Sequence, residues 1–256
     1  LVIRRESEGV RRYAHIGTGN YNPSTAKIYS DLGLFTADKA VCADVTDLFN
    51  AITGYSRKGD YRQLLVSPHT TRSGIVSRIE REIAKHKESS DGYIAFKMNQ
   101  LVDKECIQAL YRASQAGVRV RLQIRGICCL RPGVPGVSET IEVTSIVGRF
   151  LEHARVFYFR NGGDDEMYIG SADLMPRNLD RRVEVLVPVR EKVLRETLLR
   201  DMLEPHLADT AKAWKLSVDG AYSRIAPAEG TPAVDSQKIM MQHSKGWNPP
   251  ERSDDR

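Results

Sequence analysis

Two short stretches, far apart in the chain, carry the same residue types in the same order. The first is Ile16-Gly17-Thr18-Gly19-Asn20 and the second is Ile169-Gly170-Ser171-Ala172-Asp173. In each copy a proline stands six residues after the first glycine and an acidic residue stands fourteen after it. These are Pro23 and Asp31 in the first copy and Pro176 and Glu184 in the second. The agreement, in register and without a gap, indicates an internal repeat.

The residue types of the repeat suit a phosphoryl site. A glycine lets backbone N–H groups approach an anion closely. The hydroxyl of Thr18 or Ser171 can donate a hydrogen bond, and Asn20 or Asp173 can orient a neighbouring imidazole. A tight turn that needs glycine and asparagine for its geometry alone would explain either copy by itself. The two copies together favour the functional interpretation.

A histidine precedes the second copy. His153-Ala154-Arg155 opens a strand seventeen residues before Gly170. This order of histidine, cation, strand and Gly-Ser resembles the H-x-K…G-S/T-x-N/D arrangement of the phospholipase D superfamily. In that superfamily two such halves meet at one site, where one histidine attacks phosphorus and the other serves as acid or base. Imidazole suits both roles because it can form a phosphoramidate and titrates near neutral pH.

The chain departs from the superfamily pattern at two positions. Arg155 replaces the lysine, and Arg160 stands where the motif has an aspartate. These changes disfavour hydrolysis and favour a site that holds many phosphate charges. The same spacing, counted back from Gly17, places the histidine of the first half at or before Leu1. We therefore expect the nucleophilic histidine to lie upstream of this chain.

Longer strings resemble the signature of bacterial polyphosphate kinases, from residue 1 to about Gln237. The strings are Tyr13–Asn22, Thr25–Asp31, Asn99–Asp103, Arg125–Cys128, Ser145–His153 and Gly170–Asp173. That family transfers the γ-phosphate of ATP reversibly to a growing inorganic polyphosphate chain, through a phosphohistidine and with Mg²⁺. The resemblance implies that this chain holds the end of the third of four domains and all of the fourth, both phospholipase-D-like.

The resemblance also assigns ATP-binding residues. Tyr29 matches a tyrosine that contacts the nucleotide, Arg125 matches an arginine that binds its phosphates, and His153 matches the second essential histidine. The structural alternatives are a core aromatic side chain, a solvated strand end and a structural histidine. The position of Arg125 is reasonable without the family, because ligands lie beyond the carboxyl ends of parallel strands and a guanidinium binds phosphate oxygens bidentately.

Further residues are weaker candidates for lining a phosphate or polyphosphate path. They are Thr18, Asn20, Ser171, Asp173, Arg72, Arg177 and Arg182. Arg72 precedes the start of a predicted helix, where an anion can bind. Ordinary surface charge is the alternative for each arginine. No residue is assigned as a metal ligand.

These side chains need a sheet to position them, and the pattern predicts an α/β fold. We expect a phospholipase-D-like mixed sheet flanked by helices, with one complete domain and the end of a preceding similar domain. Residues 1–62 form the C-terminal part of the first domain, 63–225 form the second, and 226–256 form a tail rich in Pro, Gly and Ser. Strands are predicted at 32–36, 63–66, 93–98, 118–124, 156–159, 167–169 and 183–187, and helices at 44–55, 73–88, 102–115 and 191–207.

Composition sets broad limits on partners. Of the 256 residues 41% are hydrophobic, which is ordinary for a globular protein. The net charge of +5 weakly favours anionic partners. No apolar run approaches the roughly 20 residues that span a bilayer. We expect ATP or ADP and inorganic polyphosphate as partners, Mg²⁺ as cofactor and no nucleic acid. The family implies a homo-oligomer in the full protein and a cytoplasmic location, with peripheral association with the inner membrane allowed.

Two other functions stay open. A phospholipase-D-type phosphodiesterase or nuclease requires H-x-K in both halves, and the half present here lacks the lysine. A non-catalytic fragment that binds nucleotide or polyphosphate is the other alternative. We expect the chain alone to be inactive, because the nucleophilic histidine is absent from it.

Overall fold

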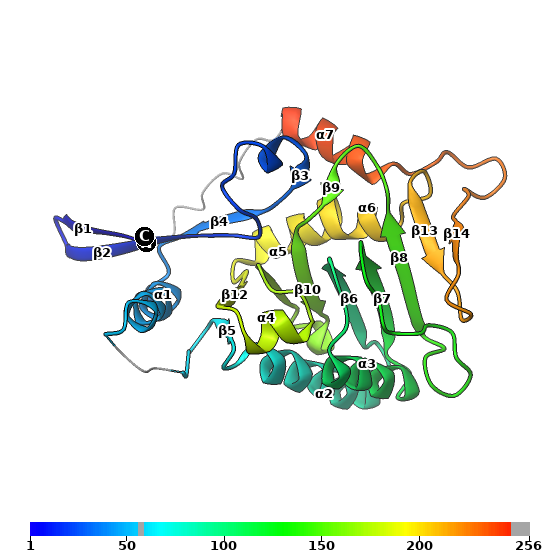
Figure 1. Cartoon of the computed structure of the whole chain (residues 1–256), viewed down its shortest axis with the longest axis horizontal. Coiled ribbons are helices and arrows are strands. Elements are labelled where there is room, and N and C mark those ends of the chain that lie inside the picture. The colour runs from blue at the N-terminus through cyan, green and yellow to red at the C-terminus, as the bar shows by residue number, and fades with distance from the viewer. Residues whose placement is uncertain (56–58, 247–256) are drawn as a thin grey trace.

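The computed structural model describes residues 1–55 and 59–246, and its body is one large mixed sheet (Figure 1). Nine strands form this sheet: β5 (Leu65–Ser67), β6 (Tyr93–Met98), β7 (Arg119–Ile124), β8 (Ile141–Ile146), β10 (Arg155–Phe159), β11 (Glu166–Gly170), β12 (Glu184–Pro188), β13 (Ala213–Leu216) and β14 (Tyr222–Arg224). Their order is β14-β13-β8-β7-β6-β10-β11-β12-β5. The α/β class with a mixed sheet is thereby confirmed.

The centre of the sheet is parallel. Strands β6, β7 and β8 run parallel, and α3 (Lys104–Gln115) connects the first two. Strand β10 is antiparallel to both β6 and β11. The parallel strands end at the same edge, which is where polar side chains that follow them meet.

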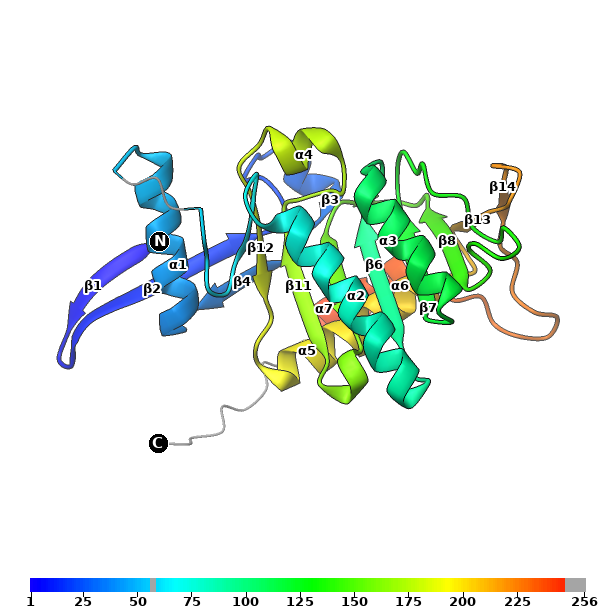
Figure 2. The same ribbon diagram turned by 90° about the horizontal axis from the view of Figure 1, so that it is seen from below.

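Helices cover both faces of the sheet. Helices α2 (Thr71–Ser89) and α3 lie on one face, and α5 (Lys192–Leu198), α6 (Glu204–Leu207) and α7 (Ser236–Gly246) lie on the other (Figure 2). The helix predicted at 191–207 is interrupted by a π-helical turn at Leu199–Leu203. Pro205 stands at the start of α6 and cannot donate to the preceding turn, which accounts for the irregular geometry.

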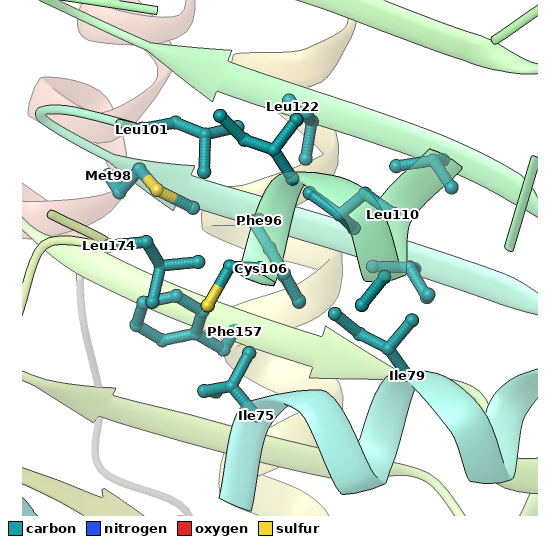
Figure 3. Close-up of a cluster of buried hydrophobic side chains, with 14 of the residues drawn as sticks. Ile75, Ile79, Phe96, Met98, Leu101, Cys106, Leu110, Leu122, Phe157 and Leu174 are labelled. Atoms are coloured by element: carbon teal, nitrogen blue, oxygen red, sulfur yellow. The ribbon is translucent and has the colours of Figure 1, made fainter. Parts of the chain in front are cut away.

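Alternation along β6 divides the core. Ile94, Phe96 and Met98 face α2 and α3, where Phe96 meets Phe157 edge to face with ring centroids 5.0 Å apart (Figure 3). Ala95 belongs to the second apolar cluster, on the side of α5 and α6. A strand buried on both faces is mostly apolar in sequence, as β6 is apart from Lys97, and its predicted bounds were correct.

The first repeat copy lies in a smaller antiparallel sheet. Strands β1 (Val2–Glu6), β2 (Gly9–Gly17) and β4 (Gly33–Thr36) form it in the order β1-β2-β4, and α1 (Lys39–Ile52) packs against β2. The helix begins earlier than predicted because the carboxylate of Asp38 caps it, accepting from the amides of Ala40 and Val41 at 2.9 Å each.

Two sets of hydrogen bonds connect the smaller sheet and its helix to the large sheet. The buried carboxylate of Asp44 in α1 accepts from the backbone amides of Gln63 (2.6 Å) and Leu64 (3.1 Å). A two-residue strand β3 (Tyr29–Ser30), preceded by the 3₁₀ turn Thr25–Lys27, pairs in parallel with β9 (Leu151–Glu152). Part of the predicted boundary segment, residues 56–58, lies outside the described residues.

The C-terminal part, predicted as a tail, contains a helix that the sequence pattern did not indicate. Residues after Ile225 include α7, whose first residue Ser236 is fully buried. Its amide and hydroxyl both donate to Asp209, at 2.8 and 2.6 Å. Strands β8, β13 and β14 and the short helix α4 (Pro176–Asp180) also escaped sequence prediction. Within residues 1–55 and 59–246, no helix has both the length and the apolar composition needed to cross a membrane.

Candidate active site

The two repeat copies have the same local geometry. The amide of Thr18 donates to the carbonyl of Leu32, and its Oγ1 accepts from the Leu32 amide, both at 2.9 Å. The amide of Ser171 donates to the carbonyl of Val185 at 3.1 Å, and its Oγ accepts from the Val185 amide at 3.3 Å. In each copy the partner directly follows the acidic residue of the repeat. The repeat seen in the sequence is therefore a repeat in structure.

Close approach explains a glycine in each copy. A Cβ atom on Gly19 would collide with the carboxylate of Asp31. A Cβ atom on Gly170 would collide with the backbone carbonyl of Val185. Both glycines let the turn of the repeat lie against its acidic segment.

Both copies line one cavity of about 260 Å³ at the ends of β2, β6, β7 and β11. Eight of the residues singled out from the sequence line it: Thr18, Asn20, Arg125, His153, Ser171, Asp173, Arg177 and Arg182. Five more residues line it: Asn99, Gln100, Arg155, Asn178 and Glu184. Of these, Arg155 is the residue that replaces the lysine of the H-x-K motif. The repeat contained the signal for Glu184. Asn99 and Gln100 follow β6, where polar residues after a parallel strand are a general signal.

His153 is held by the other half of the repeat. Its Nδ1 lies 2.9 and 3.1 Å from the two carboxylate oxygens of Asp31, and the hydroxyl of Thr18 donates to the same carboxylate at 2.7 Å. The ring of Tyr29 lies beside the imidazole, with centroids 4.6 Å apart. A carboxylate at Nδ1 makes that nitrogen the N–H donor. Nε2 is then the nitrogen that can exchange a proton, and it lies 3.1 Å from Nη1 of Arg155.

Arg125 follows β7 and is anchored through one nitrogen. Its Nε donates to Oδ1 of Asn99 at 3.2 Å and to the carbonyl of Glu152 at 3.1 Å. This anchoring leaves the two Nη groups for a ligand. Burial lowers the pKa of the Arg125 guanidinium, and the positive charge of Arg155 lowers it further. An anion bound in the cavity would relieve both effects.

Two predicted residues do not line the cavity. Tyr29 lines another cavity, of about 380 Å³, together with Asp31 and Glu152, and its ring lies beside His153. Arg72 forms ion pairs with Asp103 at 2.9 Å and Asp180 at 2.6 Å, which raise its pKa, with hydrogen bonding to Asp180 as the largest cause. Arg72 therefore joins α2 to α3 and α4, and the structure does not bring it to the other site residues.

A buried ionic cluster lies directly before His153 in the chain. The carboxylate of Glu152 is 3.0 Å from Nζ of Lys97 and 2.9 Å from Nε2 of His206, and it accepts from Nε2 of Gln237 at 2.7 Å. Burial alone would raise the pKa of Glu152. The hydrogen bond from His206 and the charge of Lys97 outweigh burial and hold the pKa well below its usual value. This cluster, which the sequence did not reveal, joins β6, β9, α6 and α7 beneath the site.

Comparisons with known proteins agree with this geometry. The family model "Polyphosphate kinase C-terminal domain 2" matches residues 64–237, and "Polyphosphate kinase C-terminal domain 1" matches residues 1–58. The chain is 56% identical over 242 residues to polyphosphate kinase 1 of Chlorobaculum tepidum, covering 94% of this chain and 34% of that protein. It is 54% identical over 244 residues to the polyphosphate kinase of Prosthecochloris aestuarii, covering 95% and 34%.

A solved structure is similar over nearly the whole chain. The crystal structure of polyphosphate kinase from Porphyromonas gingivalis superposes with a TM-score of 0.89 at 39% identity, covering 96% of this chain and 38% of that one. The chain thus spans about a third of the length of the curated relatives it matches. It belongs to the polyphosphate kinase family and corresponds to the C-terminal region of those proteins.

Proposed function

We propose that this chain supplies the acid–base histidine and the phosphate-binding arginines of a polyphosphate kinase. The reaction is reversible transfer of the γ-phosphate of ATP to a growing inorganic polyphosphate chain. The single observation that carries the proposal is the shared cavity, which both repeat copies line and in which Asp31 of one copy holds His153 of the other.

The proposed transfer has two steps. A histidine upstream of this chain attacks the γ-phosphorus, so that a P–N bond forms and the bond to the leaving oxygen of ADP breaks. The terminal oxygen of polyphosphate then attacks the phosphohistidine, and the P–N bond breaks. His153 lies across the phosphate from the nucleophile and exchanges a proton at Nε2 with a phosphate oxygen, while Asp31 keeps its Nδ1 side fixed.

Positioning and charge neutralisation supply most of the rate enhancement in such a transfer. Arg125 after β7, and Arg177 and Arg182 in and directly after α4, line the cavity and would neutralise charge on the equatorial oxygens. Tyr29 lies beside His153 and is proposed to contact the nucleotide. The hydroxyl of Thr18 donates to Asp31 and that of Ser171 accepts from the Val185 amide, so both side chains help to shape the cavity wall.

Mg²⁺ is proposed to reach the site mainly on substrate phosphates. In the described part of the chain, no group of three or more His, Cys, Asp or Glu residues is placed to hold a metal ion. The cavity carboxylates Asp173 and Glu184 are engaged by Arg155 and Asn178. Mg²⁺ commonly takes one or two carboxylates together with phosphate oxygens and water, and when bound it would neutralise phosphate charge.

The test is polyphosphate synthesis from ATP by the kinase that contains this chain. Replacing His153 by Ala should lower turnover by roughly 100-fold or more, the usual scale for loss of an acid–base group. The chain alone should bind nucleotide or polyphosphate without synthesis, because the nucleophile is upstream. Synthesis by the chain alone, or cleavage of a phosphodiester by the whole protein, would overturn the proposal.

A further inference from the structure

Arg155 occupies the centre of the contacts between the two halves. Its side chain is only 8% exposed. Nε and Nη2 donate to the two carboxylate oxygens of Asp173 at 3.3 and 3.1 Å. Nη1 donates to the carbonyl of Thr18 at 3.1 Å and to the carbonyl of His153 at 2.9 Å. One guanidinium therefore binds the first repeat copy, the second copy and the segment that carries the histidine.

The bridge extends to β6 through Asp173. Its Oδ1 also accepts from the backbone amides of Asn99 at 2.8 Å and Gln100 at 3.3 Å. The carboxylate and the guanidinium are both at least nine-tenths buried, with Asp173 5% exposed. Backbone groups at the ends of β2, β6 and β10 thus converge on one ion pair.

The charge of Arg155 is already neutralised by this pair. Its donors face protein acceptors, and its planar fork matches the carboxylate bidentately. Arg125 differs, because among the residues that the structure describes its hydrogen bonds are made through Nε, and its two Nη groups remain for a ligand. The two arginines line the same cavity but are placed for different tasks.

We propose that Arg155 is a positioning residue for His153 and not a phosphate ligand. The hydrogen bond from Arg155 to the Thr18 carbonyl links the first repeat copy to the second half of the site. The Thr18 hydroxyl donates to the carboxylate of Asp31, which contacts His153. Loss of the bridge releases Asp31 from the imidazole. A lysine cannot replace Arg155, because a single ammonium cannot reach acceptors on three segments at once.

The first experiment does not depend on the proposed function. In the chain itself, labelled with ¹⁵N-histidine, the Nδ1 proton of His153 is observed by NMR and assigned with His153→Ala. In both Arg155→Lys and Arg155→Met we expect this proton to exchange with water at least about tenfold faster, as the hydrogen bond to Asp31 opens. The signal of His206 in the same spectra reports whether the fold is intact.

A matched control is available at the other end of β10. Arg160 follows that strand and pairs with Asp91 at 3.0 Å, away from the cavity. Arg160→Met should leave the His153 signal unchanged. An unchanged signal in Arg155→Lys with the fold intact would overturn the proposal. If Arg155→Met does not fold, Arg155→Lys carries the test.

The second experiment measures turnover in the kinase that contains this chain, and rests on the proposed function. Both Arg155 variants should lower kcat by about 100-fold, the scale of a small misplacement of a catalytic group. KM for ATP and for polyphosphate should stay within roughly threefold, whereas Arg125→Met should raise KM by roughly tenfold. Near-normal turnover in Arg155→Lys with a raised KM in Arg155→Met would identify a phosphate ligand instead. A wild-type protein without synthesis would defeat the proposed function and leave the NMR result standing.

Discussion

Asp31 ends the first copy of the repeat and His153 precedes the second copy, yet Oδ1 of Asp31 lies 2.9 Å from Nδ1 of His153. The contact crosses 122 residues of sequence. It makes the orientation of the histidine depend on how the two halves are docked. Many enzymes orient an imidazole for proton transfer at Nε2 by placing a carboxylate at Nδ1.

Replacing Asp31 by Asn should therefore impair turnover more than binding. The amide preserves size but can offer its NH₂ to Nδ1, which favours the wrong tautomer. We expect kcat for polyphosphate synthesis to fall by roughly 100-fold or more, with KM for ATP little changed. Asp38→Asn is the matched control, because asparagine caps a helix as well as aspartate does. Equal losses in both variants would contradict a specific role for Asp31.

Replacing Glu152 by Gln should destabilise the fold. The side chain is 2% exposed, and its neutral replacement leaves Lys97 and His206 without their shared counter-ion. Breaking a buried pair in this way typically costs roughly 3–5 kcal/mol. Urea unfolding followed by circular dichroism measures the loss. Glu142→Gln, which removes a partner of Arg121 and Lys215 that is 33% exposed, should cost less than about 1 kcal/mol.

The same carboxylate predicts an acid-sensitive component of stability. The pKa of Glu152 is lowered in the folded state, so its contribution is present above the unfolded pKa of about 4.3 and is lost as pH falls toward the folded value. The difference in unfolding free energy between wild type and Glu152→Gln should therefore be constant from pH 7 to about pH 5 and shrink below about pH 4. A difference that grows on acidification would show that the sign of the shift is wrong.

Alanine at the two close-packed glycines should have different consequences. At Gly19 the new methyl group meets a side-chain carboxylate, which can move, so we expect a folded protein in which Asp31 is displaced and turnover is reduced. At Gly170 it meets the backbone of β12, which cannot yield easily, so we expect a loss of stability of roughly 2 kcal/mol or more. Gly17→Ala, whose methyl group meets only ordinary contacts from 3.7 Å outward, should be tolerated. Thermal unfolding and the synthesis assay separate these cases.

The sequence predicted the elements whose burial pattern is regular. Residues Tyr93–Met98 were placed correctly because a strand covered on both faces is mostly apolar, with Lys97 as the one charged residue of β6. The start of α1 was missed because its signal is a single cap, Asp38, and not a periodic pattern. Helix α7 was missed because it is held by tertiary contacts, such as that of Ser236 with Asp209.

The site was predictable to the extent that the repeat marked it. Thr18 and Ser171 were matched by type and spacing, and they line one cavity. Arg72 carries the same guanidinium group as Arg125, but it forms ion pairs with Asp103 and Asp180. These pairs engage the donors that a phosphate would need. No local pattern distinguishes an arginine paired by distant carboxylates from one left for a ligand, because the partners are set by the tertiary fold.

The short pairing of β3 with β9 has a consequence for how tolerant the site is to change. Backbone hydrogen bonds of 2.9 Å, from Leu151 to Ile28 and from Ala154 to Ser30, fix the main chain immediately before Asp31 and on both sides of His153. Hydrogen bonds between main-chain groups can form with almost any side chain at these positions. If Tyr29 contacts the nucleotide, as proposed above, replacing it should alter which nucleotide is accepted while Asp31 and His153 stay aligned. Selectivity and reactivity could then change independently of each other.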